Sequence, residues 1–211
     1  EVTLNITNKQ KHIVYTATSS KIDTSKKVTD MGTGFTREVS SVSLSKKIGT
    51  NRFRWNMRHL GAWDKNPKKA FLNGPLVVPG KYIAHLNING QTYTSDFEIL
   101  MDPNILESGI RITNVQAQEK LALQVRSLLD ESKIMAQRLK DVDEGPMLKI
   151  KKALITDEGP YPQPMLIDQA RYLGSMLDRS DQQPGEDAYT RFEELNGQFE
   201  ILKKSYNELN D

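Results

Sequence analysis

"GKYIAHLNINGQTYTSDFEIL", residues 80–100, is the stretch that decides the fold of the first half of the chain. Asn89 and Gly90 stand between two runs of alternating apolar and polar residues, and both accept the positive φ angles that a two-residue type I′ turn requires. This turn sets a register in which the apolar residues of both runs share one face. The predicted pairs are Ile88 with Gln91, Leu86 with Tyr93, Ala84 with Ser95, and Tyr82 with Phe97. The opposite, polar face then carries His85, Asn87, Thr92 and Thr94.

The residues before this hairpin also have the character of strands. Residues 2–6 alternate and residues 12–18 are rich in β-branched side chains, so we expect a second hairpin there. Residues 39–48 predict a further strand. Residues 19–38 are polar and predict a long loop. The "GTG" at 32–34 predicts a flexible turn and no phosphate-binding loop, because residue 37 is Arg where a third glycine is needed.

"NRFRWNMRHLG", residues 51–61, combines aromatic and cationic side chains. Phe53, Trp55 and Met57 alternate with polar neighbours, and this period of two predicts a strand whose aromatic side chains enter the core. A nucleic-acid surface needs its aromatic and cationic groups exposed together, whereas here the alternation separates them. The cations of the wet face remain candidates for contact with an anion or an acidic partner: Arg52, Arg54 and Arg58.

Two residues beyond this alternation complete the candidate binding site. His59 follows the arginines, and Trp63 lies next to "DKNPKK". An exposed Trp beside Lys and Arg can stack on a sugar or on a side chain of a partner. In the other interpretation, Trp63 folds back and plugs the open end of the β-rich half, and the usual burial of Trp favours this second one.

After residue 112 the apolar spacing becomes that of helices. We predict helices over 114–142, 147–156 and 165–178 and one near the end of the chain. Thr113 and Gln116 have the spacing of a capping box at the start of the first helix. "DEGPYPQP" (157–164) predicts a rigid connection, because proline cannot join a helix ladder. The last helix has two series spaced by seven, which predict a packed seam: Phe192, Phe199 and Tyr206, and Leu195, Leu202 and Leu209.

Composition and charge divide the chain in the same place. Residues 1–100 hold 15 Lys and Arg against 7 Asp and Glu, whereas residues 101–211 hold 14 against 20. This split predicts two modules with different surfaces, and the acidic second half disfavours nucleic acid as a partner. Cysteine is absent, which excludes disulfides and thiol catalysis. No stretch approaches the about 18 apolar residues of a membrane span. The start at Glu1 predicts a processed protein or a fragment.

The sequence predicts no catalytic residue, no metal and no cofactor. "DVDEG" (141–145) begins like a calcium loop, but Lys152 occupies the twelfth position of that frame. Glu193 and Glu194 are neighbours on a helix and do not face a common point, which disfavours paired-carboxylate glycosidase chemistry there. Carboxylates from different elements can still meet in the fold.

Several motifs resemble the C-terminal region of bacterial BNR-repeat glycosyl hydrolases and sortilin-type β-propeller proteins. The resemblance covers roughly residues 40–209 and rests on motifs that occur in order. They are "GTNRFRWNMRHLG" (49–61), "GPLVVPGKYIAHLNINGQTYTSDFEILMDPN" (74–104), "VQAQEKLALQVRSLLDE" (115–131) and "QPGEDAYTRFEEL" (183–195). The strand part also resembles the immunoglobulin-like domain of flagellar hook-capping proteins.

This resemblance implies an immunoglobulin-like antiparallel β-sandwich over 1–102 and an antiparallel three- to four-helix bundle over 113–211, attached behind a β-propeller. It carries over no catalysis, because the Asp-box motif of the propeller does not occur in the 211 residues. We therefore expect an extracytoplasmic, non-catalytic module that serves as a scaffold or docks an upstream β-propeller or another protein. The alternatives are a part of a secreted glycan or peptide hydrolase that contributes substrate contacts near Trp63, and a carbohydrate-binding module.

Overall fold

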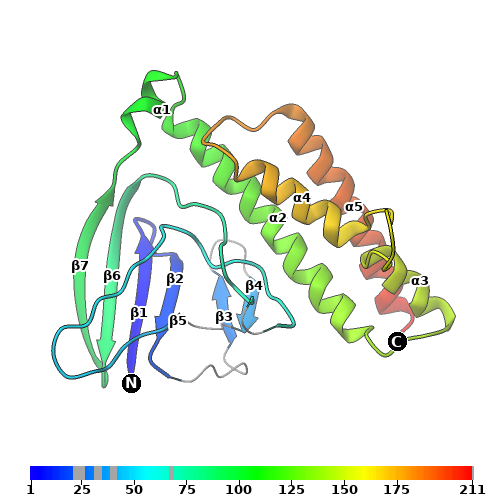
Figure 1. Ribbon diagram of the computed structural model, residues 1–211, viewed down its shortest axis with the longest axis horizontal. Coiled ribbons are helices and arrows are strands. Elements are labelled where there is room, and N and C mark those ends of the chain that lie inside the picture. Colours follow the sequence, from blue (N-terminus) through cyan, green and yellow to red (C-terminus); the bar gives the residue numbers. More distant parts are fainter. Residues whose placement is uncertain (21–26, 31–34, 39–41, 67–68, 211) are drawn as a thin grey trace.

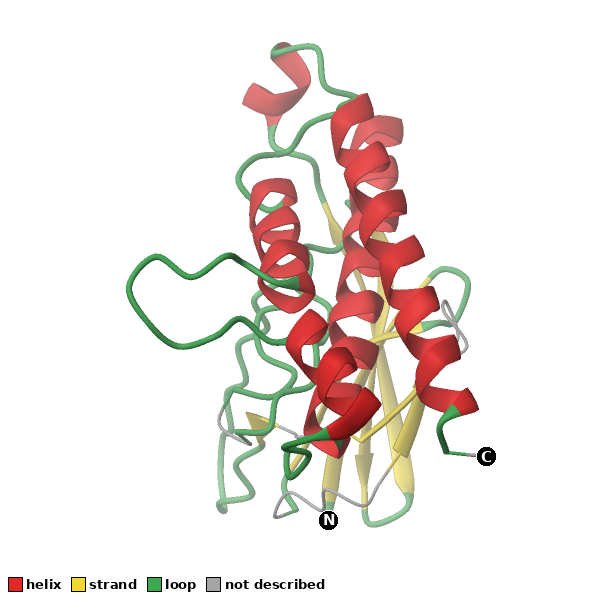
Figure 2. Cartoon of the chain, turned by 90° about the vertical axis from the view of Figure 1, so that its right-hand side faces the viewer, coloured by secondary structure: helices red, strands yellow, loops and turns green. Residues whose placement is uncertain are grey.

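The chain forms a β-rich half followed by a helical half (Figure 1). The structure is a computed structural model that describes residues 1–20, 27–30, 35–38, 42–66 and 69–210, with the backbone alone for 27–30, 35–38 and 42–43. A side view shows the helices lying in front of the sheet (Figure 2). The arrangement confirms the α+β class that the sequence predicts.

The β-rich half is built on a sheet of five strands in the order β5-β2-β1-β6-β7. Its strands are β1 (Val2–Asn8), β2 (Ile13–Thr18), β5 (Val42–Ser43), β6 (Gly80–Ile88) and β7 (Gln91–Ile99). All neighbours pair antiparallel except β2 and β5, which pair parallel. A separate two-stranded hairpin consists of β3 (Lys27–Asp30) and β4 (Phe35–Glu38). The predicted hairpin over 2–18 is confirmed as β1 and β2.

Two predictions for the residues between β2 and β6 are wrong. The expected loop over 19–38 contains β3 and β4, whose sequences KVTD and FTRE lack the apolar alternation by which strands are recognised. Of the strand expected over 39–48, the described residues form only the two-residue β5. The turn expected at 32–34 lies outside the described residues.

The β6–β7 hairpin has the register that the Asn89-Gly90 turn predicts. Tyr82 pairs with Phe97, Leu86 with Tyr93 and Ile88 with Gln91. The two turn residues have φ of 50° and 88°, as a type I′ turn requires. Because β1 pairs with β6 so that Leu4 lies opposite Leu86, the apolar face of this hairpin continues the apolar face of β1.

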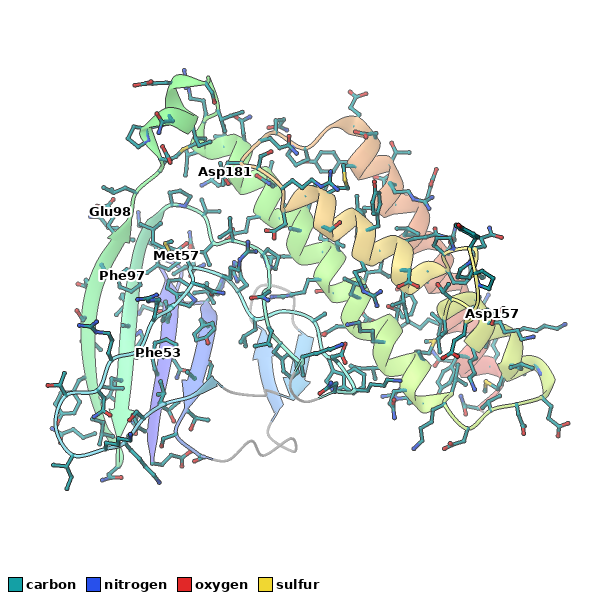
Figure 3. All side chains as sticks on the ribbon, viewed as in Figure 1. Phe53, Met57, Phe97, Glu98, Asp157 and Asp181 are labelled. Carbon is teal, nitrogen blue, oxygen red and sulfur yellow. The ribbon has the colours of Figure 1, made fainter. Side chains whose placement is uncertain are left out.

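The stretch 51–61 is not a strand, and here the prediction is wrong. Phe53 and Trp55 do turn inward, since the Trp55 ring lies 6.0 to 6.1 Å from the rings of Tyr15, Tyr82 and Phe97. Met57, however, has φ of 57° and is 48 % exposed. The left-handed backbone at Met57 interrupts the alternation, so only two of the three expected core residues cover the sheet. Figure 3 shows Phe53 over the sheet half.

The helical half contains the four predicted helices and one that the sequence did not predict. They are α2 (Ile112–Arg138), α3 (Gly145–Leu154), α4 (Leu166–Leu177) and α5 (Glu186–Glu208), and the additional one is the single-turn α1 (Pro103–Glu107). The start of α2 differs from the predicted capping box at Thr113. Arg111 is the N-cap residue instead, and its backbone N–H donates to Asn114 Oδ1 at 2.7 Å.

One apolar core holds α2, α3, α4 and α5 together. The predicted seam of α5 contributes to it unevenly. Leu195 and Phe199 are fully buried, and Leu202 packs against the core, but Leu209 is 46 % exposed. Since Leu209 caps the helix end, the seam extends about as far as Tyr206 and no further.

Candidate functional site

Arg58 forms a contact between the β-rich half and the helical half. Its guanidinium Nη1 donates to Asp178 Oδ1 at 2.8 Å and Oδ2 at 2.9 Å, just after the end of α4. The same nitrogen donates to the carbonyl of Gly74 at 2.9 Å. Because Nη1 binds groups of its own chain and the side chain is 22 % exposed, Arg58 has a structural role and does not face water as the predicted arginine stripe requires.

His59 lies beside Arg58 and is bound to α2. It is 9 % exposed, and its Nε2 lies 2.8 Å from Glu119 Oε1. The same carboxylate oxygen accepts the backbone N–H of Val78 at 3.0 Å. A histidine oriented by a carboxylate can act as a general base. Here, however, the carboxylate also binds the backbone, so the pair holds two stretches of the connecting segment, the residues 44–66 and 69–79 between β5 and β6, against α2.

Trp63 continues this attachment along α2. Its backbone N–H donates to the carboxylate of Asp130, which is 1 % exposed. One turn away on the same helix, the guanidinium of Arg126 donates to the carbonyl of Leu60 at 3.2 Å. Trp63 itself is partly buried at α2. The structure thus brings Arg58, His59 and Trp63 together at the contact between the halves.

Two glycines, Gly61 and Gly74, let the connecting segment pass close to itself beside this contact. A Cβ on Gly74 would lie 2.4 Å from the carbonyl oxygen of His59 and 2.5 Å from that of Leu60. Both oxygens belong to backbone that is held by other bonds, including the His59 N–H to the Pro75 carbonyl at 2.8 Å. Glycine is therefore required at 74 for close packing.

We expect Gly74→Ala to lower the free energy of unfolding by about 2 kcal/mol, because the backbone must shift to admit the methyl group. Gly197→Ala is the matched control, since no atom lies within 4 Å of a Cβ there. Gly197 is exposed inside α5, so alanine should raise stability by about 1 kcal/mol. Urea unfolding measures both. Equal effects of the two substitutions would contradict the close approach at Gly74.

Asp64 adds a pH-dependent bond to the same contact. Burial raises the pKa of its carboxyl, but the Asn66 backbone N–H and the Lys133 ammonium, 3.1 Å away, outweigh it, and the net pKa is lowered. A lowered folded-state pKa contributes stability above the unfolded value of about 3.9, and this contribution disappears as the pH falls through the folded pKa.

We therefore expect wild-type protein to lose more stability than Asp64→Asn when the pH falls from 7 to below about 4. The amide keeps the shape of the carboxyl and does not titrate in this range. Chemical unfolding of both proteins across this interval measures the difference. Parallel pH profiles for the two would show that Asp64 contributes nothing to the contact.

A cleft of about 690 Å³ opens between the end of the sheet and α2. His59 and Glu119 form part of its wall, with His12, Tyr82 and the lysines Lys9, Lys81 and Lys120 around them. Burial raises the pKa of the Tyr82 hydroxyl, and the nearby charge of Glu119 adds to this effect. Tyr82 donates to the carbonyl of Val78, so it too supports the connecting segment.

Arg52 lies elsewhere, at a groove on the apolar face of the sheet. The groove has a volume of about 820 Å³ and lies between β1, β6, β7 and residues 44–53. Tyr93 is 51 % exposed in it, although its position in the register belongs to the apolar face. Its apolar lining includes Val2, Leu4, Phe53, Leu86 and Tyr93, and its cationic lining consists of Lys46, Lys47 and Arg52. Arg54 is exposed between this groove and the contact at Arg58.

Four of the five candidate residues thus belong to two places, and Arg54 lies at neither of them. Sequence reasoning missed the groups that hold three of them, because their partners come from α2 and α4. One signal was present: Glu119, Arg126, Asp130 and Lys133 are spaced by seven, four and three, which puts all four on one face of a helix. Nothing in the spacing distinguishes a buried polar face of this kind from a solvated one.

Comparisons with models of protein families, with curated proteins and with solved structures found no match for this chain. Among the described residues, no helix has both the length and the apolar character needed to cross a bilayer. The function is therefore inferred from the geometry of the groove and of the contact between the halves.

Proposed function

We propose that this chain is a non-catalytic module that docks another protein through the groove on the apolar face of its sheet. The observation that carries the proposal is the exposure of Tyr93 and Ile88, at 51 % and 37 %, beside Lys46, Lys47 and Arg52. Apolar side chains that form a hollow with a charged rim are typical of interaction sites.

The contact between the halves also supports the assignment of docking to the groove. Arg58, His59 and the backbone of Trp63 bind groups of their own chain, whereas Arg52 lines the open groove. A rigid attachment to the helical half holds the sheet, and the groove on it, in one orientation. This is the property that a scaffold or docking module needs.

The proposal extends to the surroundings of the chain. We infer that the β-rich half is an immunoglobulin-like sandwich and the helical half an antiparallel bundle, attached to a β-propeller protein outside the cytoplasm. The support is the order of the motifs in residues 49–195 and the predicted hairpin register, which is the one found in β6 and β7. In this setting the propeller carries any catalysis.

Site-specific cross-linking tests the docking role. A photoreactive phenylalanine analogue replaces Tyr93 in one protein and Arg138 in another, because Arg138 is exposed on α2 away from the groove. In extracts of the producing organism, we expect a defined protein adduct at position 93 and a much weaker one at 138. Equal labelling at both positions, or none at 93, would contradict docking at the groove.

A carbohydrate-binding module is the second candidate, and the exposed ring of Tyr93 favours it. An aromatic ring on the same face of the sheet as Ser95, with Asn51 also lining the groove, offers both a stacking surface and hydrogen-bonding groups for a sugar. A glycan array separates the candidates. Binding that disappears in Tyr93→Ser would favour the sugar, and an array without binding would leave protein docking.

A further inference from the structure

The strand β7 forms the edge of the sheet next to the groove. Figure 1 shows β7 as the outermost strand, on the far side of the sheet from α4 and α5. Residues 91–96 are exposed without interruption. Within the described part of the chain, β7 pairs with β6 and with no other strand.

The register of the hairpin identifies the free backbone groups of this edge. After a two-residue turn, Ile88 and Gln91 form a hydrogen-bonded pair, and in an antiparallel ladder such pairs alternate with non-hydrogen-bonded ones. Thr92, Thr94 and Asp96 are therefore in non-hydrogen-bonded pairs, so their N–H and C=O groups point away from β6. They offer a row of donors and acceptors to a further strand.

β7 lacks most of the usual protections of an edge. Edge strands avoid pairing by bulges, prolines or charged side chains, above all lysines. The nine-residue register of β7 with β6 is continuous, and its sequence, QTYTSDFEI, contains no proline and no lysine. Its charged side chains are Asp96 and Glu98, both exposed on the polar face; Figure 3 marks Glu98 on this strand.

We propose that β7 binds an extended segment of a partner protein by strand addition, and that this segment alternates apolar and basic residues. This inference rests on the proposed docking role and specifies its partner. Side chains of an added strand alternate between the two faces. Those on the apolar face meet Tyr93 and Phe97, whereas those on the other face meet Thr94, Asp96 and Glu98.

Charge decides between a partner and a second copy of the chain. Two β7 strands paired antiparallel about Thr94 would place Asp96 opposite Thr92, and because β7 contains no Lys or Arg, neither copy would supply a cation to Asp96 and Glu98. Lysines or arginines at every second position of a partner segment would instead face these carboxylates. The complementary occupant is therefore a basic, amphipathic strand.

Synthetic peptides of about eight residues test this inference on the intact chain. The probe alternates valine and lysine; one control alternates valine and glutamate, and another has the composition of the probe with the valines and lysines in separate blocks. NMR measures binding and the exchange of backbone amide hydrogens. We expect the alternating valine-lysine peptide alone to bind and to protect the amides of Thr92, Thr94 and Asp96.

Two pairs of variants locate the contact. Thr94→Pro removes an outward N–H that the β6 ladder does not use, and we expect affinity for the peptide to fall about tenfold, whereas Thr94→Val keeps the N–H and the affinity. Asp96→Lys should reverse the preference toward the valine-glutamate peptide, and Asp96→Asn should weaken the original preference without reversing it. The unfolding curves of the four variants check that each one folds.

The results separate this inference from the docking role on which it rests. Strand addition is overturned if the valine-lysine peptide does not bind, if it binds without protecting the three amides, or if the glutamate peptide binds equally well. A partner adduct at position 93 combined with any of these outcomes would leave docking intact and exclude strand addition. Absence of the adduct as well would remove both.

Discussion

Replacing Trp55 with alanine is expected to lower the free energy of unfolding by about 3 kcal/mol, at the lower end for a buried Trp because its side chain is partly exposed. The indole lies against three aromatic rings of the sheet, and its Nε1 donates to the carbonyl of Arg58 at 2.9 Å. Its removal takes away the cover of the apolar face and the bond that fixes the chain before Arg58. Urea unfolding measures the loss.

Met57→Ala is the matched control for this prediction. Met57 occupies the third position of the same alternation but is 48 % exposed, so its truncation should change stability by less than about 0.5 kcal/mol. A large effect at Met57 together with a small one at Trp55 would mean that the chain does not turn at Met57 as described.

Asp130→Ala is expected to have an effect of similar size, about 3 kcal/mol. The carboxylate is 1 % exposed and accepts the backbone N–H of Trp63, so its removal leaves this part-buried N–H without its charged acceptor. Asp130→Asn keeps an acceptor in place and should cost less. Asp141→Ala is the surface control, because its side chain is 87 % exposed and its change should be within about 0.5 kcal/mol.

An unfolding experiment on these three variants also tests the contact between the halves. If the β-rich half of Asp130→Ala unfolds at a lower denaturant concentration than its helical half, the contact with α2 stabilises the β-rich half in the wild-type protein. If Asp130→Ala is as stable as Asp141→Ala, the buried bond to Trp63 does not contribute.

Local patterns were sufficient to predict the parts of the fold that local interactions determine. The turn at Asn89-Gly90 fixed the register of β6 and β7, and the spacing of apolar residues placed α2, α3, α4 and α5. The alternation of Phe53, Trp55 and Met57 did not predict a strand correctly. An alternating sequence indicates which side chains face the core, but it does not show whether the backbone pairs with a neighbouring strand. The positive φ of Met57 then turned its side chain away from the core.

The candidate site was harder to predict, because the role of each of its residues depends on partners that are far away in the sequence. Arg52 and Arg58 are six residues apart in one alternating pattern. One lines an open groove, and the other binds Asp178, 120 positions later. Tyr93 was predicted on the apolar face, but the register alone does not tell whether that face is covered.

The same charge reversal at these two arginines tests the central claim most directly. Arg52→Glu should reduce the yield of the cross-linked adduct at position 93 and leave the unfolding curve unchanged. Arg58→Glu should shift the unfolding curve to lower denaturant, because it places a carboxylate against Asp178. An Arg52→Glu protein that keeps its full yield of adduct, beside an Arg58→Glu protein of unchanged stability, would contradict the division into a docking groove and a structural contact.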